Sequence, residues 1–360
     1  MNNNNRLISL DVFRGLTIAA MLLVNFPGSW GAIYGSLEHA KWVGTTPTDF
    51  VFPFFIFIVG ISVALAFTKQ LDAGKTKSEL LTKSFWRFVK IFAIGMFLKI
   101  LPTFDFSRIE LPGVLQRIAL VFIACAILFL YTGWKRQLYI ALGILAAYVL
   151  ALKFIPVPNI GAGILDPGKN LTNWMDGVVI PHFLLNKKGY DSEGFLSTFP
   201  AIASGITGLM AGRLLTISRD KQKTVQTFLL TGLVLTIAGY GLSLYLPIIK
   251  RIWTSSYALV TSGWAFMVFA LIYWLVEIKE LKTGLKPWII FGSNAIAIYV
   301  LADVFETLYY VTGLHDFAMT TMVNSGIYIY TASLLWAIFS VLTCFVPAYI
   351  LYRKKIFIKL

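Results

Sequence analysis

Three side chains near the amino end of the chain have the types and spacing for acid–base chemistry. His39 and Asp49 lie ten residues apart, and Asn25 precedes the histidine by fourteen residues. A histidine accepts and donates protons near neutral pH, and a carboxylate can orient its ring and raise its basicity. An amide can donate a hydrogen bond to the oxygen of a tetrahedral intermediate. The three residues could therefore perform acyl transfer, whereas a single histidine in a loop is also compatible with a simply solvated side chain.

Polar side chains also recur inside the first apolar segment. Asp11 and Arg14 are three residues apart, so a helix places them on one face, where they could form an internal ion pair or bind a ligand. Asn25 follows Arg14 by eleven residues, which is three helical turns and roughly 16 Å. Thr17 lies on the same stripe. The pattern predicts a polar track that joins the cation to the amide.

Further cations lie in or beside apolar runs. Lys83, Arg87 and Lys90 are spaced four and three apart, so on a helix they share a face that could bind phosphates or extend toward lipid headgroups. Arg117 lies within an apolar run, where a cation must face protein, water or ligand. These positions are the cationic candidates for an anionic cofactor.

Aromatic and hydroxyl side chains gather at the start of a later apolar segment, at Trp253, Ser255, Ser256 and Tyr257. Such groups line sugar sites, but aromatic residues also belong at the membrane interface. The two remaining histidines, His182 and His315, lie in segments between apolar runs and are expected to be solvated. Neither cysteine belongs to a cluster with zinc spacing, so no metal is expected.

The elements that must position these residues are membrane helices. Hydrophobic residues make up 58% of the 360, charged residues only 13%, and the mean hydropathy is +0.75, which excludes an ordinary soluble domain. The net charge of +14 is distributed between apolar runs, so it indicates anionic lipid as a partner rather than nucleic acid.

About ten spans of adequate length are predicted, in a single polytopic all-α domain over residues 1–360. The spans fall near 7–26, 49–68, 84–101, 112–131, 137–155, 196–217, 226–247, 254–276, 287–308 and 327–352. Lys and Arg concentrate in alternate connections and in the carboxyl tail. Because short cytoplasmic loops retain basic residues, both termini are predicted to be cytoplasmic.

The sequence resembles the heparan-α-glucosaminide N-acetyltransferase family, including its bacterial relatives of amino-sugar pathways. The resemblance is carried by blocks in family order over almost the whole chain: SLDVFRG at 9–15, VNF at 24–26, EHAKW at 38–42, DFVFPF at 49–54, LPGVLQR at 111–117, GFLST at 194–198, WTSSY at 253–257 and GSNAI at 292–296. The resemblance implies a transmembrane acyltransferase fold that takes acetyl-CoA from the cytosol and acetylates a sugar amine on the outer side.

Residue roles follow from these blocks. His39 matches the family's catalytic histidine, Asn25 its active-site asparagine and Asp49 the acidic residue after the histidine. The residues expected to bind acetyl-CoA are Asp11, Arg14, Arg87, Lys90, Gln116, Arg117 and Asn294, and those expected to bind the sugar are Trp253, Ser255, Ser256 and Tyr257. A second copy of the chain is a further candidate partner.

The start of the chain bears on the acceptor. Only a few residues precede Asp11, whereas the lysosomal enzyme of the family carries an additional lumenal domain there, so recognition of a long heparan chain is not expected. We therefore expect a bacterial-type enzyme of the inner membrane that acts on free glucosamine or a short amino-sugar fragment.

A secondary transporter for amino sugars is the alternative, because it too would have many helices, a basic charge and buried ionic groups. Such transporters often show inverted repeats and interrupted helices, and the sequence makes neither evident. An assembly protein would not need polar residues at depth in several helices.

The basic-loop pattern predicts that residues 70–82 and 160–190 lie on opposite sides of the membrane, the former in the cytoplasm. Single cysteines introduced into the two segments should react with an impermeant reagent from opposite sides. Labelling of both from the same side would contradict the predicted arrangement.

Overall fold

The structure is a computed structural model that describes residues 7–101, 110–181, 184–185 and 191–358. Throughout these residues the regular elements are helices, joined by turns and two isolated bridges. Within the described part of the chain, eight helical segments are long and apolar enough to cross a membrane, or nine if the bent pair of α10 and α11 forms one span. This confirms the predicted all-α membrane fold.

The remaining expected span, 84–101, falls in α3 (Lys77–Ile100), which has 24 residues. This helix is less apolar than the others because Lys83, Arg87 and Lys90 lie along it, together with charged residues near both ends. The expected span 287–308 is interrupted, since α10 (Lys286–Ser293) and α11 (Ala295–Val311) meet at an angle of 83°.

The chain divides into two compact units, each assembled from segments that are distant in the sequence. Unit 1 contains Met1–His39, Thr46–Phe55 and Val268–Leu360, and unit 2 contains Ala40–Thr45 and Ile56–Met267. The helices α2 (Val51–Asp72) and α9 (Ser255–Tyr273) contribute residues to both units. A single domain over the whole chain stays a prediction.

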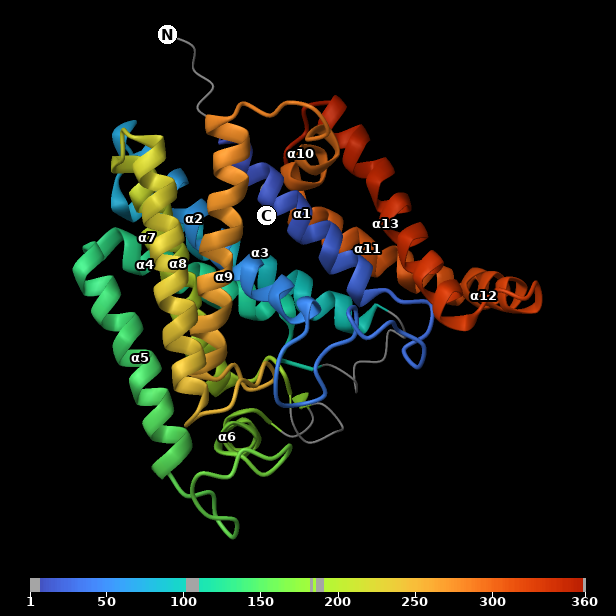
Figure 1. The fold of residues 1–360 in the computed structure, drawn as a ribbon, viewed down its shortest axis with the longest axis horizontal. Helices are drawn as coiled ribbons and strands as arrows, with labels where there is room; N and C mark the ends of the chain where they lie inside the picture. Colours follow the sequence, from blue (N-terminus) through green and yellow to red (C-terminus); the bar gives the residue numbers. More distant parts are fainter. Residues whose placement is uncertain (1–6, 102–109, 182–183, 186–190, 359–360) are drawn as a thin grey trace. The chain divides into compact units, whose positions relative to one another are not determined.

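Unit 1 is built around α1 (Ile8–Asn25), which packs along α10 (Figure 1). Side chains are absent where the two backbones approach most closely: a Cβ at Gly15 would overlap the carbonyl of Trp288, and one at Gly292 would overlap the carbonyl of Asp11. Beyond α11 lie α12 (Leu314–Asn324) and α13 (Ile329–Arg353), and short helices η1 (Pro47–Phe50) and η4 (Trp274–Ile278) complete the unit.

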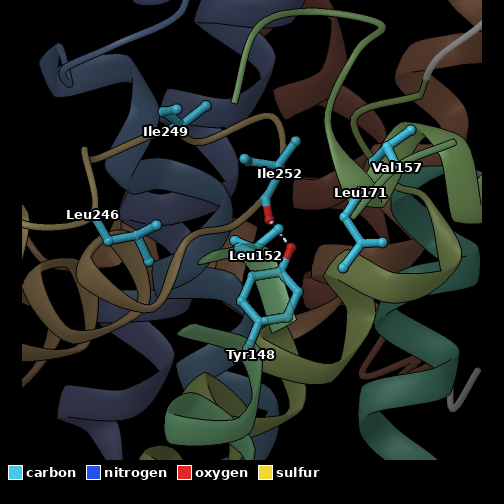
Figure 2. Close-up of a cluster of buried hydrophobic side chains, with 7 residues drawn as sticks. All are labelled: Tyr148, Leu152, Val157, Leu171, Leu246, Ile249 and Ile252. Carbon is cyan, nitrogen blue, oxygen red and sulfur yellow. Dashed lines mark hydrogen bonds between the residues drawn. The ribbon is translucent and has the colours of Figure 1, made fainter. Parts of the chain in front are cut away.

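Among its described residues, unit 2 contains the part of α2 after Phe55, the first part of α9 and six further helices. They are α3, α4 (Val114–Tyr131), α5 (Trp134–Phe154), α6 (Leu171–Val179), α7 (Phe195–Ile217) and α8 (Lys221–Ser243). A buried apolar cluster joins α5, α6 and the segment before α9 through Tyr148, Leu152, Val157, Leu171, Leu246, Ile249 and Ile252 (Figure 2). The Tyr148 hydroxyl donates a hydrogen bond to the Ile252 carbonyl inside this cluster, which fixes the turn that precedes α9.

Close packing of α2 on α7 depends on small residues. A Cβ at Gly60 would overlap the Gly205 carbonyl, and one at Gly208 would overlap the Phe57 carbonyl. Lipid tails are as apolar as the surfaces of the helices, so the hydrophobic effect does not drive helices together in a membrane. Close backbone contacts of this kind provide van der Waals attraction instead.

We expect Gly208→Ala to destabilise the protein, by about 1 to 3 kcal/mol, because the added methyl group must push the two helices apart. Gly143→Ala on α5 is the matched control, since a Cβ there meets open space and alanine favours a helix by about 0.5 to 1 kcal/mol. Thermal unfolding in detergent should show a lower midpoint for the first variant and an unchanged or higher one for the control. Equal midpoints for both variants would contradict the close packing.

Candidate active site

His39 and Asp49 form a hydrogen-bonded pair in unit 1. His39 Nδ1 lies 2.7 Å from Asp49 Oδ1, the carboxylate is fully buried, and the histidine side chain is 33% exposed. A carboxylate accepts hydrogen bonds only, so the pair places a proton on Nδ1 and leaves the lone pair of the neutral ring on Nε2. The structure brings these two residues together, and their catalytic roles stay a prediction.

The turn before α2 holds Asp49 in place. Thr46 is the N-cap of η1, its backbone N–H donates to Asp49 Oδ2 at 3.0 Å, and its hydroxyl lies 3.2 Å from the same oxygen. The Thr46 hydroxyl also lies 2.6 Å from the carbonyl oxygen of Glu38, the residue before His39. Pro47 starts the helix without needing a backbone donor. This capping box therefore ties both members of the pair to one short turn.

Asn25 is the last residue of α1 and is partly exposed. It belongs to the same unit as His39 and Asp49. The predicted polar track along α1 is not formed by Thr17, because its hydroxyl donates to the Phe13 carbonyl of its own helix at 2.8 Å. Serine and threonine hydroxyls in apolar helices commonly bond in this way, since no water is available.

Asp11 and Arg14 form the ion pair that was one of the two interpretations of their spacing. Arg14 Nη1 lies 3.5 Å from Asp11 Oδ1 and 3.3 Å from the Gly292 carbonyl oxygen of α10. Asp11 is buried and the Arg14 side chain is 24% exposed. The cation is thus oriented by the protein and still reachable from solvent.

Asn294 lies at the break between α10 and α11, where its amide holds the end of the chain. Its Nδ2 donates to the Ile356 carbonyl at 3.0 Å, and its Oδ1 accepts from the Ile358 N–H at 2.8 Å. Both ends of the amide are therefore used by the protein. If Asn294 contributes to acetyl-CoA binding, it does so by holding residues 356–358 in place.

The other expected acetyl-CoA residues belong to unit 2 and differ in exposure. Lys90 and Arg87 are exposed on α3, and the Arg87 guanidinium lies over the Phe122 ring at 4.7 Å. Gln116 is buried at the start of α4, with Nε2 3.5 Å from the Met96 sulfur. The cations are accessible to a ligand, whereas Gln116 contributes to packing between α3 and α4.

Arg117 is 1% exposed and belongs to a polar cluster at the start of α7. Its Nη2 donates to the Gly194 carbonyl at 3.2 Å and to the Ser197 hydroxyl, and its guanidinium lies over the Trp253 ring at 5.2 Å. Two further Arg117 nitrogens, Nε and Nη1, are buried with no hydrogen-bond partner among the described residues. Such unsatisfied donors are costly to bury, which makes this cluster a candidate for ligand binding.

Three acidic residues outside the predicted set of site residues lie near enough to Arg117 to act on its charge: Glu193, Asp191 and Asp176. Asp176 is fully buried, accepts from the Phe195 N–H at 2.7 Å, and has a second oxygen, Oδ2, with no described partner. Burial raises the pKa of Asp176 to about 7, against the opposing influence of the Phe195 N–H and Arg117. Burial likewise raises the pKa of Glu193 to about 7, although Arg117 favours its charged form and Asp191 opposes it. Asp191 and Glu193 directly precede a recognised block at 194–198, a signal that could have included them.

The expected sugar-binding residues lie within the interior of unit 2. Trp253, Ser255, Ser256 and Tyr257 are at most 1% exposed. The Ser255 hydroxyl donates to the Leu145 carbonyl, the Ser256 hydroxyl to the Pro247 carbonyl, and Trp253 Nε1 to the Ser204 hydroxyl. Trp253 also has a φ of 47°, which a bulky residue rarely adopts. Trp253 thus lies in a tightly constrained turn beside Arg117, and Ser255, Ser256 and Tyr257 are the first residues of α9.

His315 is buried, contrary to the expectation that it is solvated. Its Nε2 lies 2.9 Å from the Gly28 carbonyl oxygen, and its Nδ1 lies 2.9 Å from Asp316 Oδ1. Its ring also packs on Tyr310, with 4.2 Å between the ring centroids. The tertiary fold covers this side chain because α12 closes over the segment that follows α1. His182 lies outside the described residues.

The raised pKa of Glu193 makes stability depend on pH. The folded state holds the Glu193 proton up to a pKa of about 7 and the unfolded chain only to its ordinary 4.5, so stability falls as the pH rises between these values. Glu193→Gln keeps this side chain neutral at every pH. We therefore expect the variant to lose less stability than the wild type as the pH rises from about 4.5 to about 7, and to unfold at a higher temperature than the wild type above about pH 7. Glu79→Gln, on an exposed side chain, is the control. Identical pH profiles for all three proteins would contradict the assignment.

Comparison with known proteins places these features in a family. The family model described as "Heparan-alpha-glucosaminide N-acetyltransferase, catalytic" matches residues 6–248. The human protein named heparan-alpha-glucosaminide N-acetyltransferase is 30% identical over 415 residues, which cover 99% of this chain and 60% of the relative. The mouse protein of the same name is 28% identical over 417 residues, covering 99% and 61%.

The chain thus spans about six tenths of the length of the curated relatives it matches. The family model reaches from α1 to residue 248, in the segment between α8 and α9, and includes the His39–Asp49 pair and Arg117. The match covers well over half of the chain, and the chain belongs to the heparan-α-glucosaminide N-acetyltransferase family.

Proposed function

We propose that the protein transfers an acetyl group from acetyl-CoA to the amine of a glucosamine-type sugar. The observation that carries this proposal is the His39–Asp49 pair, in which a fully buried carboxylate orients a partly exposed imidazole within a member of an N-acetyltransferase family. An amine acceptor needs such a base, because an ammonium group cannot attack a thioester until it loses a proton.

In the proposed mechanism His39 is the general base and transfer is direct. The neutral ring takes a proton from the sugar ammonium, and the amine nitrogen then bonds to the thioester carbonyl carbon. Asn25 donates a hydrogen bond to the oxyanion of the tetrahedral intermediate. The carbon–sulfur bond breaks, and the departing CoA thiolate takes the proton that the new amide nitrogen releases. His39 releases the proton it took from the ammonium to solvent, which restores the neutral base. Asp49 keeps the ring in the required tautomer throughout.

Acetyl-CoA is proposed to approach from the cytosol, with its phosphates near cationic residues. Arg14 is suited to this because Asp11 and Gly292 orient it while part of the side chain stays exposed. Arg87 and Lys90 are accessible on α3. Arg117 is proposed for the same ligand on the basis of its unpartnered donors, and Gln116 and Asn294 through the packing and tail contacts described above.

The acceptor is proposed to bind on the outer side, near Trp253 and the first residues of α9, which are Ser255, Ser256 and Tyr257. Because these side chains are buried and bonded to other protein groups, their proposed contribution is to shape the region around Arg117. We further propose that the protein is located in the bacterial inner membrane and that its acceptor is free glucosamine or a short amino-sugar fragment.

One observation favours the alternative of an amino-sugar transporter. The 83° break between α10 and α11 is the kind of interrupted helix that lines transporter sites. A transporter would move sugar across a vesicle membrane without acetyl-CoA. If vesicles take up the sugar without CoA, and purified protein does not acetylate it, the protein is a transporter and not an acetyltransferase.

Purified protein should acetylate glucosamine with acetyl-CoA as the donor. We expect His39→Ala to retain acetyl-CoA binding and to lose about 100-fold or more in kcat, because proton transfer by a positioned base contributes at least that much. Glu38→Gln, which changes the exposed neighbouring side chain, is the control and should keep wild-type turnover. Full activity of the His39 variant would show that His39 is not the general base.

Direct transfer also predicts the kinetic pattern. Initial-rate plots for the two substrates should intersect, since both must be bound before transfer. Parallel plots, or radiolabelled acetyl that stays on the protein after CoA is removed, would instead establish an acetyl-histidine intermediate.

A further inference from the structure

The carboxyl end of the chain forms a defined structure that we call the C-terminal strap, residues 354–358. Helix α13 ends at Arg353, and the Lys355 N–H then donates to the Tyr352 carbonyl while the Ile356 N–H donates to the Leu351 carbonyl at 2.9 Å. This is the bond pattern of a Schellman motif, which turns the chain away from the helix axis. The strap therefore leaves α13 in a fixed direction.

Asn294 fastens the strap to the break between α10 and α11. The amide accepts from the Ile358 N–H and donates to the Ile356 carbonyl, so it pairs with the strap backbone as a neighbouring strand would. The tie uses both hydrogen-bonding ends of a buried side chain.

A cation at Arg14 lies at the same break. Arg14 Nη1 is 3.3 Å from the carbonyl of Gly292, two residues before Asn294. Asp11 offsets the charge of Arg14, whereas the strap adds the exposed Lys354 and Lys355. The short backbone segment 292–294 therefore contacts Arg14 through the Gly292 carbonyl and the strap backbone through the Asn294 side chain, all within unit 1.

Lys355 occupies a backbone conformation that favours glycine. Its φ is 56°, the left-handed region that usually holds glycine at this position of a helix end. A side chain there strains the backbone, and strain of this kind tends to occur at functional positions. A lysine side chain at this position is thus a second observation, independent of the Asn294 bonds, for a function of the strap.

We propose that Lys354 and Lys355 of the strap, together with Arg14, bind the phosphate groups at the nucleotide end of acetyl-CoA, with Asn294 as the residue that positions the strap. The inference rests on the proposed function, because it assigns a binding surface to its donor. Ammonium and guanidinium groups are the usual protein ligands of phosphate. Asn294 then acts on acetyl-CoA without touching it.

Lys355→Gly separates this role from folding. Glycine suits the left-handed conformation, so we expect thermal stability equal to or above that of the wild type. The variant should nevertheless bind acetyl-CoA about three- to tenfold more weakly, the range for loss of a partly exposed ionic contact. Lys282→Ala, an equally exposed lysine of the same unit, should bind acetyl-CoA normally.

S-acetylpantetheine, which has the thioester but no phosphates, tests the chemistry of the contact. We expect Lys355→Gly and the double variant Lys354→Ala/Lys355→Ala to lower kcat/KM for acetyl-CoA and to leave kcat/KM for S-acetylpantetheine unchanged. Asn294→Ala should reproduce the double variant if the strap must be held in place. An equal loss for both donors, or no loss for either, would overturn the proposal.

Lipid headgroups also carry phosphate, so the binding measurement is made in nanodiscs of neutral and of anionic lipid. Weaker acetyl-CoA binding by the strap variants in both lipids supports the proposal. A normal dissociation constant for acetyl-CoA, with an effect on anionic-lipid binding alone, would assign the strap to the membrane surface instead. Failure of the proposed function would appear differently, as no acetyl transfer from either donor by the wild type.

Discussion

The interaction on which the proposed site depends is the burial of the Asp49 carboxylate. An ionised group without water must be paired and hydrogen-bonded, or it loses its charge. Asp49 meets this requirement with the His39 ring on one oxygen and the Thr46 N–H on the other. The same carboxylate therefore caps the start of η1 and sets the tautomer of the histidine. Structure and chemistry at this position cannot be changed independently.

A second constraint is close backbone contact between helices that have little else to hold them together in lipid. Gly15 and Gly292 let α1 and α10 approach each other in unit 1, and the same contact brings the Gly292 carbonyl to Arg14. In unit 2 the cost of burying Arg117 is only partly met by Gly194, Ser197 and the Trp253 ring. The groups left unsatisfied in that cluster belong to titratable side chains, which is typical of functional sites.

The two units hold different parts of the proposed chemistry. Unit 1 contains His39, Asp49 and Asn25, with the cation at Arg14 and the strap. Unit 2 contains the cluster around Arg117, in which burial raises the pKa of Asp176 and Glu193 to about 7. Groups that titrate near neutral pH can exchange protons with a bound ligand at little cost.

Sequence alone determined the features that depend on composition and on local order. The apolar runs predicted the spanning helices, and the recognised blocks led to His39, Asp49 and Arg117 and to the family. Tertiary structure alone decided how each polar group is satisfied, because hydrogen-bond partners come from distant segments: Asn294 meets a tail 62 residues away, and His315 meets Gly28. The acids around Arg117 were missed for the same reason. Their pKa values depend on burial and on neighbours that only folding brings together.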